Sequence, residues 1–143
     1  MEGKIRLSDG EWTLMNELWK GPASVGALVK ALRGETGWSK STVFIMLSRL
    51  IEKGAVACDD AVSPKLYSAL ISREGAALSE TRSFLGRVYG GSLGSMMSCM
   101  AANHELSRED IDELVAILRR AEEEVGGDLF VHLQNLLYLC NRI

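Results

Sequence analysis

Hydroxyl and ammonium side chains gather in the short run Ser39-Lys40-Ser41-Thr42. Ser39 is a good N-cap residue and the apolar residues after it recur at helical spacing, so the run lies at the start of a predicted helix. Backbone N–H groups and the positive end of the helix dipole meet at such a position, where they attract phosphate groups or base edges. The predicted chemistry is nucleic-acid binding; ordinary capping with solvent exposure is the alternative.

The predicted helix covers residues 39–53 and has two different faces. One face is apolar at helical spacing and should be buried; it consists of Val43, Leu47 and Leu50. On the other face, Phe44 and Ile45 are apolar where a surface helix would carry polar groups, which indicates a partner there. The helix residues predicted to contact DNA are Ser39, Lys40, Ser41, Thr42, Phe44, Ile45, Ser48 and Arg49. For Arg49, a salt bridge with a neighbouring acid is an equally good interpretation.

Two shorter helices and a hairpin should position this helix. Ser8 and Glu11 match a capping box, and Ser24 is a candidate N-cap for the second helix. Strands are predicted over 55–58 and 65–70, with a polar loop between them. Three helices and a hairpin make a winged helix-turn-helix. The loop carries Asp59 and Asp60 against Lys65, the wing residue predicted to contact DNA. We expect Trp12, Trp19 and Trp38 to belong to the core.

From Ser72 onward the pattern changes to longer amphipathic helices. Their apolar residues have no further core to join, so pairing with the same helices of a second chain is the economical arrangement. The predicted dimerisation residues are Phe84, Leu85, Val88, Leu93, Met96, Met97, Met100, Ile111, Leu114 and Leu118. A last helix is predicted from about residue 128, as an extension of the dimer core or a docking helix for another partner.

Residues at fixed spacing around the helix 39–53 resemble a known family. The pattern W-S-x-x-T-V-x-x-x-L-x-R-L-x-x-K-G is met by Trp38, Ser39, Thr42, Val43, Leu47, Arg49, Leu50, Lys53 and Gly54. It resembles the recognition helix of the BlaI/MecI/CopY family of penicillinase and methicillin-resistance repressors. Further matches at residues 7–19, 83–85, 90–92 and 106–114 extend the resemblance over roughly residues 5–122.

The resemblance implies a dimeric transcriptional repressor that binds an inverted-repeat operator in double-stranded DNA. It also implies control by a membrane sensor-protease pathway that cuts an Asn-Phe bond in the dimerisation helix. That bond aligns with Cys99-Met100, and the Asn-Phe pair is not present. One branch of the family senses copper and carries a paired C-x-C signature, which is absent here. Buried thiols and surface imidazoles explain Cys58, Cys99, Cys140, His104 and His132 better than a metal site.

Composition excludes several other classes of protein. The chain has 143 residues, 47% of them hydrophobic, which favours a globular fold. Its three cysteines are odd in number and widely spaced, and no bilayer-length apolar run or signal-peptide core is visible, so we expect a cytoplasmic protein without membrane insertion. No phosphate loop, zinc-binding H-E-x-x-H or nucleophile elbow occurs, so neither an enzyme nor a cofactor is predicted.

The net charge of −3 is divided unevenly along the chain. Residues 1–73 carry ten Lys and Arg against eight Asp and Glu, or +2, whereas residues 74–143 carry six against eleven, or −5. The weakly basic half should therefore bind DNA with modest, salt-sensitive non-specific affinity, and the acidic half should avoid phosphate.

The predicted fold is mainly α, with a winged-helix DNA-binding domain over residues 1–71 and a helical dimerisation domain over residues 72–143. The predicted function is DNA binding by a dimeric repressor. A protein-interaction module that kept the fold but lost operator binding is the competing hypothesis. Phe44, Ile45, the acidic wing and the negative net charge favour this second hypothesis.

Overall fold

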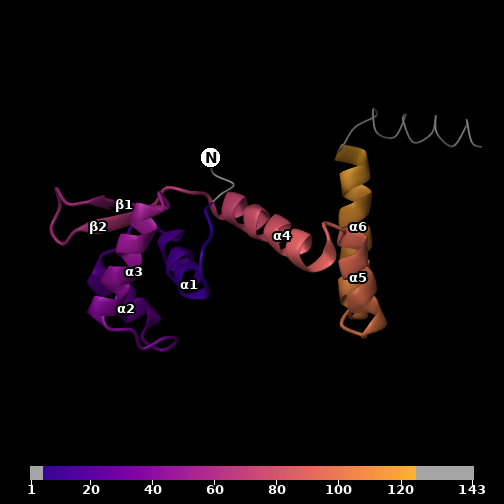
Figure 1. The fold of residues 1–143 in the computed structure, drawn as a ribbon, viewed down its shortest axis with the longest axis horizontal. Helices are drawn as coiled ribbons and strands as arrows, with labels where there is room; N and C mark the ends of the chain where they lie inside the picture. The colour runs from indigo at the N-terminus through magenta and orange to yellow at the C-terminus, as the bar shows by residue number, and fades with distance from the viewer. Residues whose placement is uncertain (1–4, 125–143) are drawn as a thin grey trace, which may run out of the picture. The chain divides into compact units, whose positions relative to one another are not determined.

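The structure is a computed structural model that describes residues 5–124. It is mainly α, with one two-stranded antiparallel sheet in this part of the chain (Figure 1). The elements are α1 (Asp9–Leu18), α2 (Val25–Leu32), α3 (Lys40–Glu52), β1 (Val56–Asp59), β2 (Leu66–Ala69), α4 (Arg73–Tyr89), α5 (Leu93–Ala102) and α6 (Arg108–Glu124). The predicted mainly α fold with a winged helix-turn-helix is confirmed.

Serine side chains begin the first three helices, as the sequence predicts. At α1, the Glu11 backbone N–H donates to Ser8 Oγ at 3.3 Å, and the Ser8 N–H donates to Glu11 Oε1 at 2.9 Å. Ser24 caps α2 and Ser39 caps α3 in the same way, each accepting from the backbone N–H three residues later. These bonds satisfy N–H groups that have no partner within their helix, which fixes where each helix starts.

A single apolar core holds the three helices and the hairpin together. Val43, Leu47 and Leu50 are fully buried, which confirms the predicted inner face of α3. The three tryptophans predicted in the core are only half-buried and pack against its edge. Trp19 uses this position to donate its indole N–H to the backbone oxygen of Ile71 at 2.9 Å. The remaining core residues are Leu7, Leu14, Met15, Leu18, Leu28, Leu32, Ala55, Val56 and Tyr67.

The hairpin forms the wing, and its second strand is bonded to the residue before the α2 N-cap. Strands β1 and β2 pair in antiparallel register from Val56 opposite Ala69 to Asp59 opposite Leu66. Buried Tyr67 exchanges two backbone hydrogen bonds with Ala23, of 2.9 and 3.0 Å. Because Ala23 directly precedes the α2 N-cap, this bridge places the start of α2 beside the wing.

The chain divides into two compact units at Gly91. Helix α4 is the last helix of the first unit, and α5 and α6 belong to the second. None of the three helices contains a buried residue, which sets them apart from α1, α2 and α3. The predicted C-terminal helix from about residue 128 lies outside the described residues.

Candidate nucleic-acid interface

The recognition helix α3 exposes the residues that the sequence predicts at its N-terminus. Ser39, Lys40 and Ser41 are exposed and Thr42 is half-buried. Ser39 Oγ accepts the Thr42 backbone N–H at 3.2 Å and lies 3.1 Å from the Thr42 hydroxyl. The first turn therefore presents hydroxyl groups, one ammonium group and backbone N–H groups to the solvent, which suits contact with a DNA backbone.

The apolar pair on the outer face of α3 is more than half exposed to solvent. Phe44 is 54% exposed and Ile45 is 52% exposed, on the side of the helix away from the buried Val43. Ser48 is exposed beside them, and its hydroxyl donates to the backbone oxygen of Phe44 at 2.9 Å. The proton of that hydroxyl is therefore already engaged, so the middle of this face has little capacity to donate hydrogen bonds.

The wing and two helix starts line one shallow depression. A depression of about 310 Å³ is bordered by Lys40 and Phe44 of α3 and by Lys65 of the wing. The structure thus brings Lys65 to the α3 residues with which it was grouped. Sequence reasoning missed the residues at the start of α2 on this border, which are the N-cap Ser24 with Val25 and Gly26; Pro64 and Tyr67 complete the border. The predicted cap at Ser24 located the start of α2, but only the bridge between Ala23 and Tyr67 shows that this start adjoins the wing.

Arg49 is exposed on α3 and was left with two interpretations. Within residues 5–124 it has no acidic partner, so the salt bridge is not found there. The ion pair of this helix is made instead by Lys53, its C-cap residue. Arg49 is therefore available to contact a phosphate.

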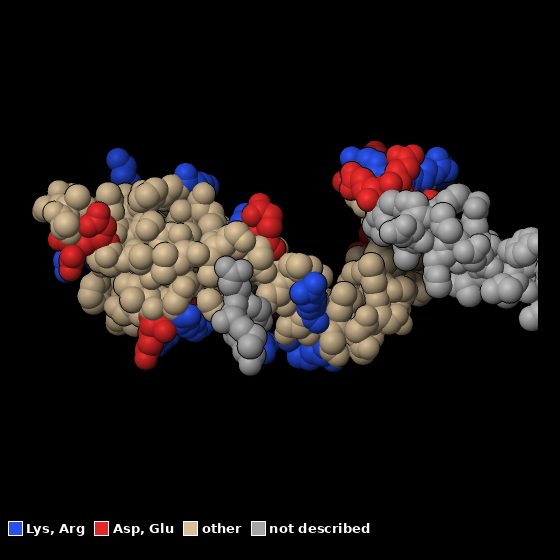
Figure 2. Space-filling view, turned by 90° about the horizontal axis from the view of Figure 1, so that it is seen from above, with Lys and Arg blue, Asp and Glu red and all other residues tan. Residues whose placement is uncertain are grey.

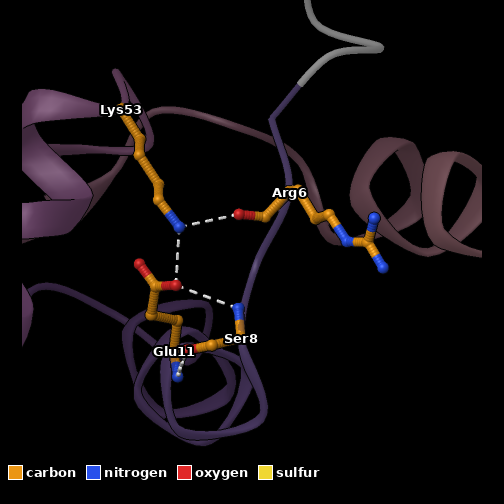
Figure 3. Close-up of polar contacts among 4 residues, drawn as sticks. All are labelled: Arg6, Ser8, Glu11 and Lys53. Atoms are coloured by element: carbon orange, nitrogen blue, oxygen red, sulfur yellow. Dashed lines mark hydrogen bonds and ion pairs between the residues drawn. The ribbon is translucent and has the colours of Figure 1, made fainter.

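Lys53 fastens the end of α3 to the start of α1 (Figure 3). Its ammonium nitrogen lies 2.6 Å from Glu11 Oε1 and donates to the backbone oxygen of Arg6 at 2.8 Å. Burial raises the pKa of Glu11, but the hydrogen bonds from Lys53 and Ser8 outweigh it and leave that pKa lowered. Glu11 remains ionised at neutral pH, and the pair fixes the orientation of α3 on the core. The sequence analysis assigned Glu11 to the capping box alone.

The face of the N-terminal unit seen in Figure 2 is not strongly basic. Figure 2 shows Lys and Arg in small separate groups, with Asp and Glu among them. At the wing, Asp59 and Asp60 are exposed, and Asp59 Oδ1 accepts the backbone N–H of Ala61 at 3.1 Å. The wing tip is therefore acidic, as the sequence indicated, and it should oppose non-specific attraction to DNA.

The cysteines correct one expectation. Cys58 and Cys99 were predicted to be buried, but both thiols are exposed, because β1 turns Cys58 outward and α5 has no buried position. His104 is exposed as predicted. Within residues 5–124 no three His, Cys, Asp or Glu side chains are grouped so that they could bind a metal ion. Cys140 and His132 lie outside the described residues. No described helix has both the length and the apolar character that crossing a membrane requires.

A three-helix core with a wing, whose third helix exposes the first turn and outer face described above, defines a winged-helix DNA-binding regulator. Residues 7–120 match the penicillinase repressor family, and the chain belongs to that family. It is thereby a transcriptional repressor and not an enzyme.

Two sequence relatives, the first two described below, agree with this assignment over most of the chain. The penicillinase repressor of Bacillus licheniformis is 34% identical over 79% of this chain and 89% of its own. The methicillin resistance regulatory protein MecI of Staphylococcus aureus is 27% identical over 80% of this chain and 94% of its own. A solution structure of monomeric Bacillus licheniformis BlaI, in complex with the blaP half-operator, is 29% identical, with a TM-score of 0.44 over 50% of this chain and 88% of that one.

Proposed function

We propose that the protein represses transcription as a homodimer that binds an inverted-repeat operator in double-stranded DNA. Each N-terminal unit inserts α3 into the major groove of one half-site, and the bound dimer blocks access to the promoter. Membership of the penicillinase repressor family supports the repressor role. The observation that carries the DNA-binding step is the exposed face of α3, which is capped by Ser39 and fastened to the core by Lys53.

The proposed contacts divide into two kinds. Lys40, Arg49 and Lys65 are exposed cations around α3, and they contact the sugar-phosphate backbone. The outer face of α3 lies against base edges, as the recognition helix does in helix-turn-helix proteins. The residues of the first turn and the outer face are Ser39, Ser41, Thr42, Phe44, Ile45 and Ser48.

The exposed apolar side chains of helices α4–α6 are the evidence for the proposed dimer. Val88 of α4, Leu93 of α5 and Leu118 of α6 are 52, 53 and 62% exposed. Phe84 and Ile111 are also exposed, whereas Leu85, Met96, Met97, Met100 and Leu114 are half-buried. Covering these residues with the same helices of a second chain removes apolar surface from water. We therefore assign DNA binding to residues 1–71 and dimerisation to residues 72–143.

A fluorescence-anisotropy titration tests the proposal. The full chain is mixed with labelled duplexes from upstream of its own gene, and the affinity is measured at several salt concentrations. A saturable preference for one duplex, with an affinity that falls as salt rises, is expected. Equal and weak binding to every duplex would contradict operator binding, and the protein-interaction module would then be the better account.

The proposed site of action is the cytoplasm, where the operator lies. The family resemblance implies a membrane sensor-protease pathway that cuts an Asn-Phe bond, and we do not propose that cleavage for this chain. The aligned bond, Cys99-Met100, lies within α5 and lacks the Asn-Phe pair. A protease specific for Asn-Phe should therefore leave this chain intact.

A further inference from the structure

Phe44 and Ile45 are two large apolar side chains side by side on the solvent face of α3, each more than half exposed. With Lys40, Ser41 and Val25 they border a second shallow depression, of about 380 Å³. Water gives such a pair no favourable contact, and the buried core lies on the opposite face of the helix. A ligand with an apolar group of matching size would remove this surface from water.

The base edges of the major groove offer one apolar group of this kind. Donors and acceptors occupy the other positions, and the exception is the C5-methyl group of thymine. Phe and Ile cannot hydrogen-bond to a base, so the methyl group is the feature that they can recognise. The Ser48 hydroxyl, which donates to the Phe44 backbone oxygen, does not restore a donor to the centre of this face.

We propose that Phe44 and Ile45 determine operator specificity by contacting thymine C5-methyl groups in each half-site. This inference rests on the proposed function, because it requires α3 to lie in the major groove. Lys40 precedes Phe44 by one helical turn and carries the charge that holds the backbone next to the apolar pair. Phosphate contact then supplies affinity, and methyl contact supplies the choice of sequence.

A protein partner fits this face less well than DNA. A stable protein interface covers about 800 Å² on each partner, and its centre is depleted of charged residues. Here two apolar side chains stand among Lys40, Ser41 and Ser48, all exposed and polar. That composition matches a surface that meets phosphates and base edges together.

The experiment begins with selection of binding sites for the full chain from a library of randomised duplexes. The enriched sequences should contain thymine at fixed positions of each half-site. Each of these thymines is then replaced by uracil, which deletes only the methyl group. At the key positions the affinity, measured by anisotropy, should fall about fivefold, the low end of the discrimination given by a specific base contact.

Variants connect the uracil effect to the two residues. Phe44→Ala and Ile45→Ala should weaken operator binding, and each should abolish the uracil penalty at its own thymine. Lys40→Ala should weaken binding to every duplex alike and keep the full penalty. Leu70→Ala is the matched control, because Leu70 is a 59% exposed apolar residue of the same unit outside α3. It should change neither affinity nor penalty.

The failures of the two proposals can be told apart. If the wild-type chain enriches no duplex sequence, operator binding itself is overturned. If it enriches a sequence but Phe44→Ala and Ile45→Ala both keep the uracil penalty, operator binding stands and methyl recognition is overturned. Melting curves of the variants should match the wild type, since both side chains lie outside the core.

Discussion

Lys53 Nζ lies 2.6 Å from Glu11 Oε1, although the two residues are 42 positions apart in the sequence. The contact joins the C-cap residue of the recognition helix to the first turn of α1. The Glu11 side chain is 5% exposed and that of Lys53 is 37% exposed, so the carboxylate is the buried member of the pair. Its second oxygen, Oε2, is buried without a hydrogen-bond partner among the described residues. Lys53 is therefore the main compensation for a charge inside the core.

The first prediction concerns removal of either member of this pair. Lys53→Met should lower the free energy of unfolding by about 3 kcal/mol, because it leaves a buried carboxylate without its counter-charge. Glu11→Gln should cost only about 1 kcal/mol, since Lys53 can turn to water and an amide oxygen still accepts from Ser8. Urea denaturation at pH 7 measures both changes. Equal losses in the two variants would show that the unpaired charge is not the cause.

The second prediction is a pH dependence of stability. The pKa of Glu11 in the folded protein lies below its ordinary value of 4.5, because the bonds from Lys53 and Ser8 outweigh the opposing effect of burial. The stabilising contribution is therefore present above pH 4.5 and is lost as the pH falls through the lowered pKa. The stability difference between wild type and Glu11→Gln should shrink over that range. Asp110 also has a lowered pKa, but it titrates in both proteins and cancels in the difference.

Local signals in the sequence determined most of the fold. Ser8, Ser24 and Ser39 could be identified as the N-caps of α1, α2 and α3 because capping depends on residues at most three positions apart. Likewise, the inner face of α3 follows from helical periodicity alone, as Val43 and Leu47 show. Features that depend on tertiary packing were not accessible in this way.

The Glu11–Lys53 pair and the position of Val25 beside α3 are two such features. No sequence pattern identifies Lys53 as the partner of Glu11 or α3 as the neighbour of Val25. Both relationships depend on how α1, α2, α3 and the wing pack together. The exposed Cys58 is a third case. A free cysteine is commonly buried, and only the orientation of β1 determines that the Cys58 side chain faces the solvent. For the candidate interface, the sequence indicated which face of α3 is exposed, and the structure added the start of α2, which borders that face.

The third prediction tests the dimer through α6. Leu118 is 62% exposed and shares one helical face with Ile111 and Leu114, whereas Ala116 lies almost opposite. Wild type should sediment at twice 15.7 kDa. Leu118→Asp should give a folded monomer, because a charge in the apolar contact must be desolvated on association. Ala116→Asp introduces the same charge on the other face and should remain dimeric. A monomeric wild type with a native circular-dichroism spectrum would refute the dimer.

The fourth prediction concerns the acidic wing. Asp60 directly follows β1 and is exposed, and no described hydrogen bond holds its carboxylate. Lys65, at the other end of the same loop, borders the proposed interface. Asp60→Asn removes a negative charge near the DNA backbone without changing the size of the side chain. It should strengthen binding to every duplex about fivefold at low salt, since charges a few ångströms apart interact by about 1 kcal/mol in water.

The effect of Asp60→Asn should not depend on the sequence of the duplex, because a phosphate contact carries no base information. It should also fade as salt rises, in step with screening. Glu74→Gln is the matched control: the same charge is removed from an exposed residue in the first turn of α4, outside α3 and the wing. Anisotropy titrations of both variants against the selected operator and a scrambled duplex make the comparison. If Asp60→Asn and Glu74→Gln change the affinities equally, net charge governs binding and the wing does not approach the DNA.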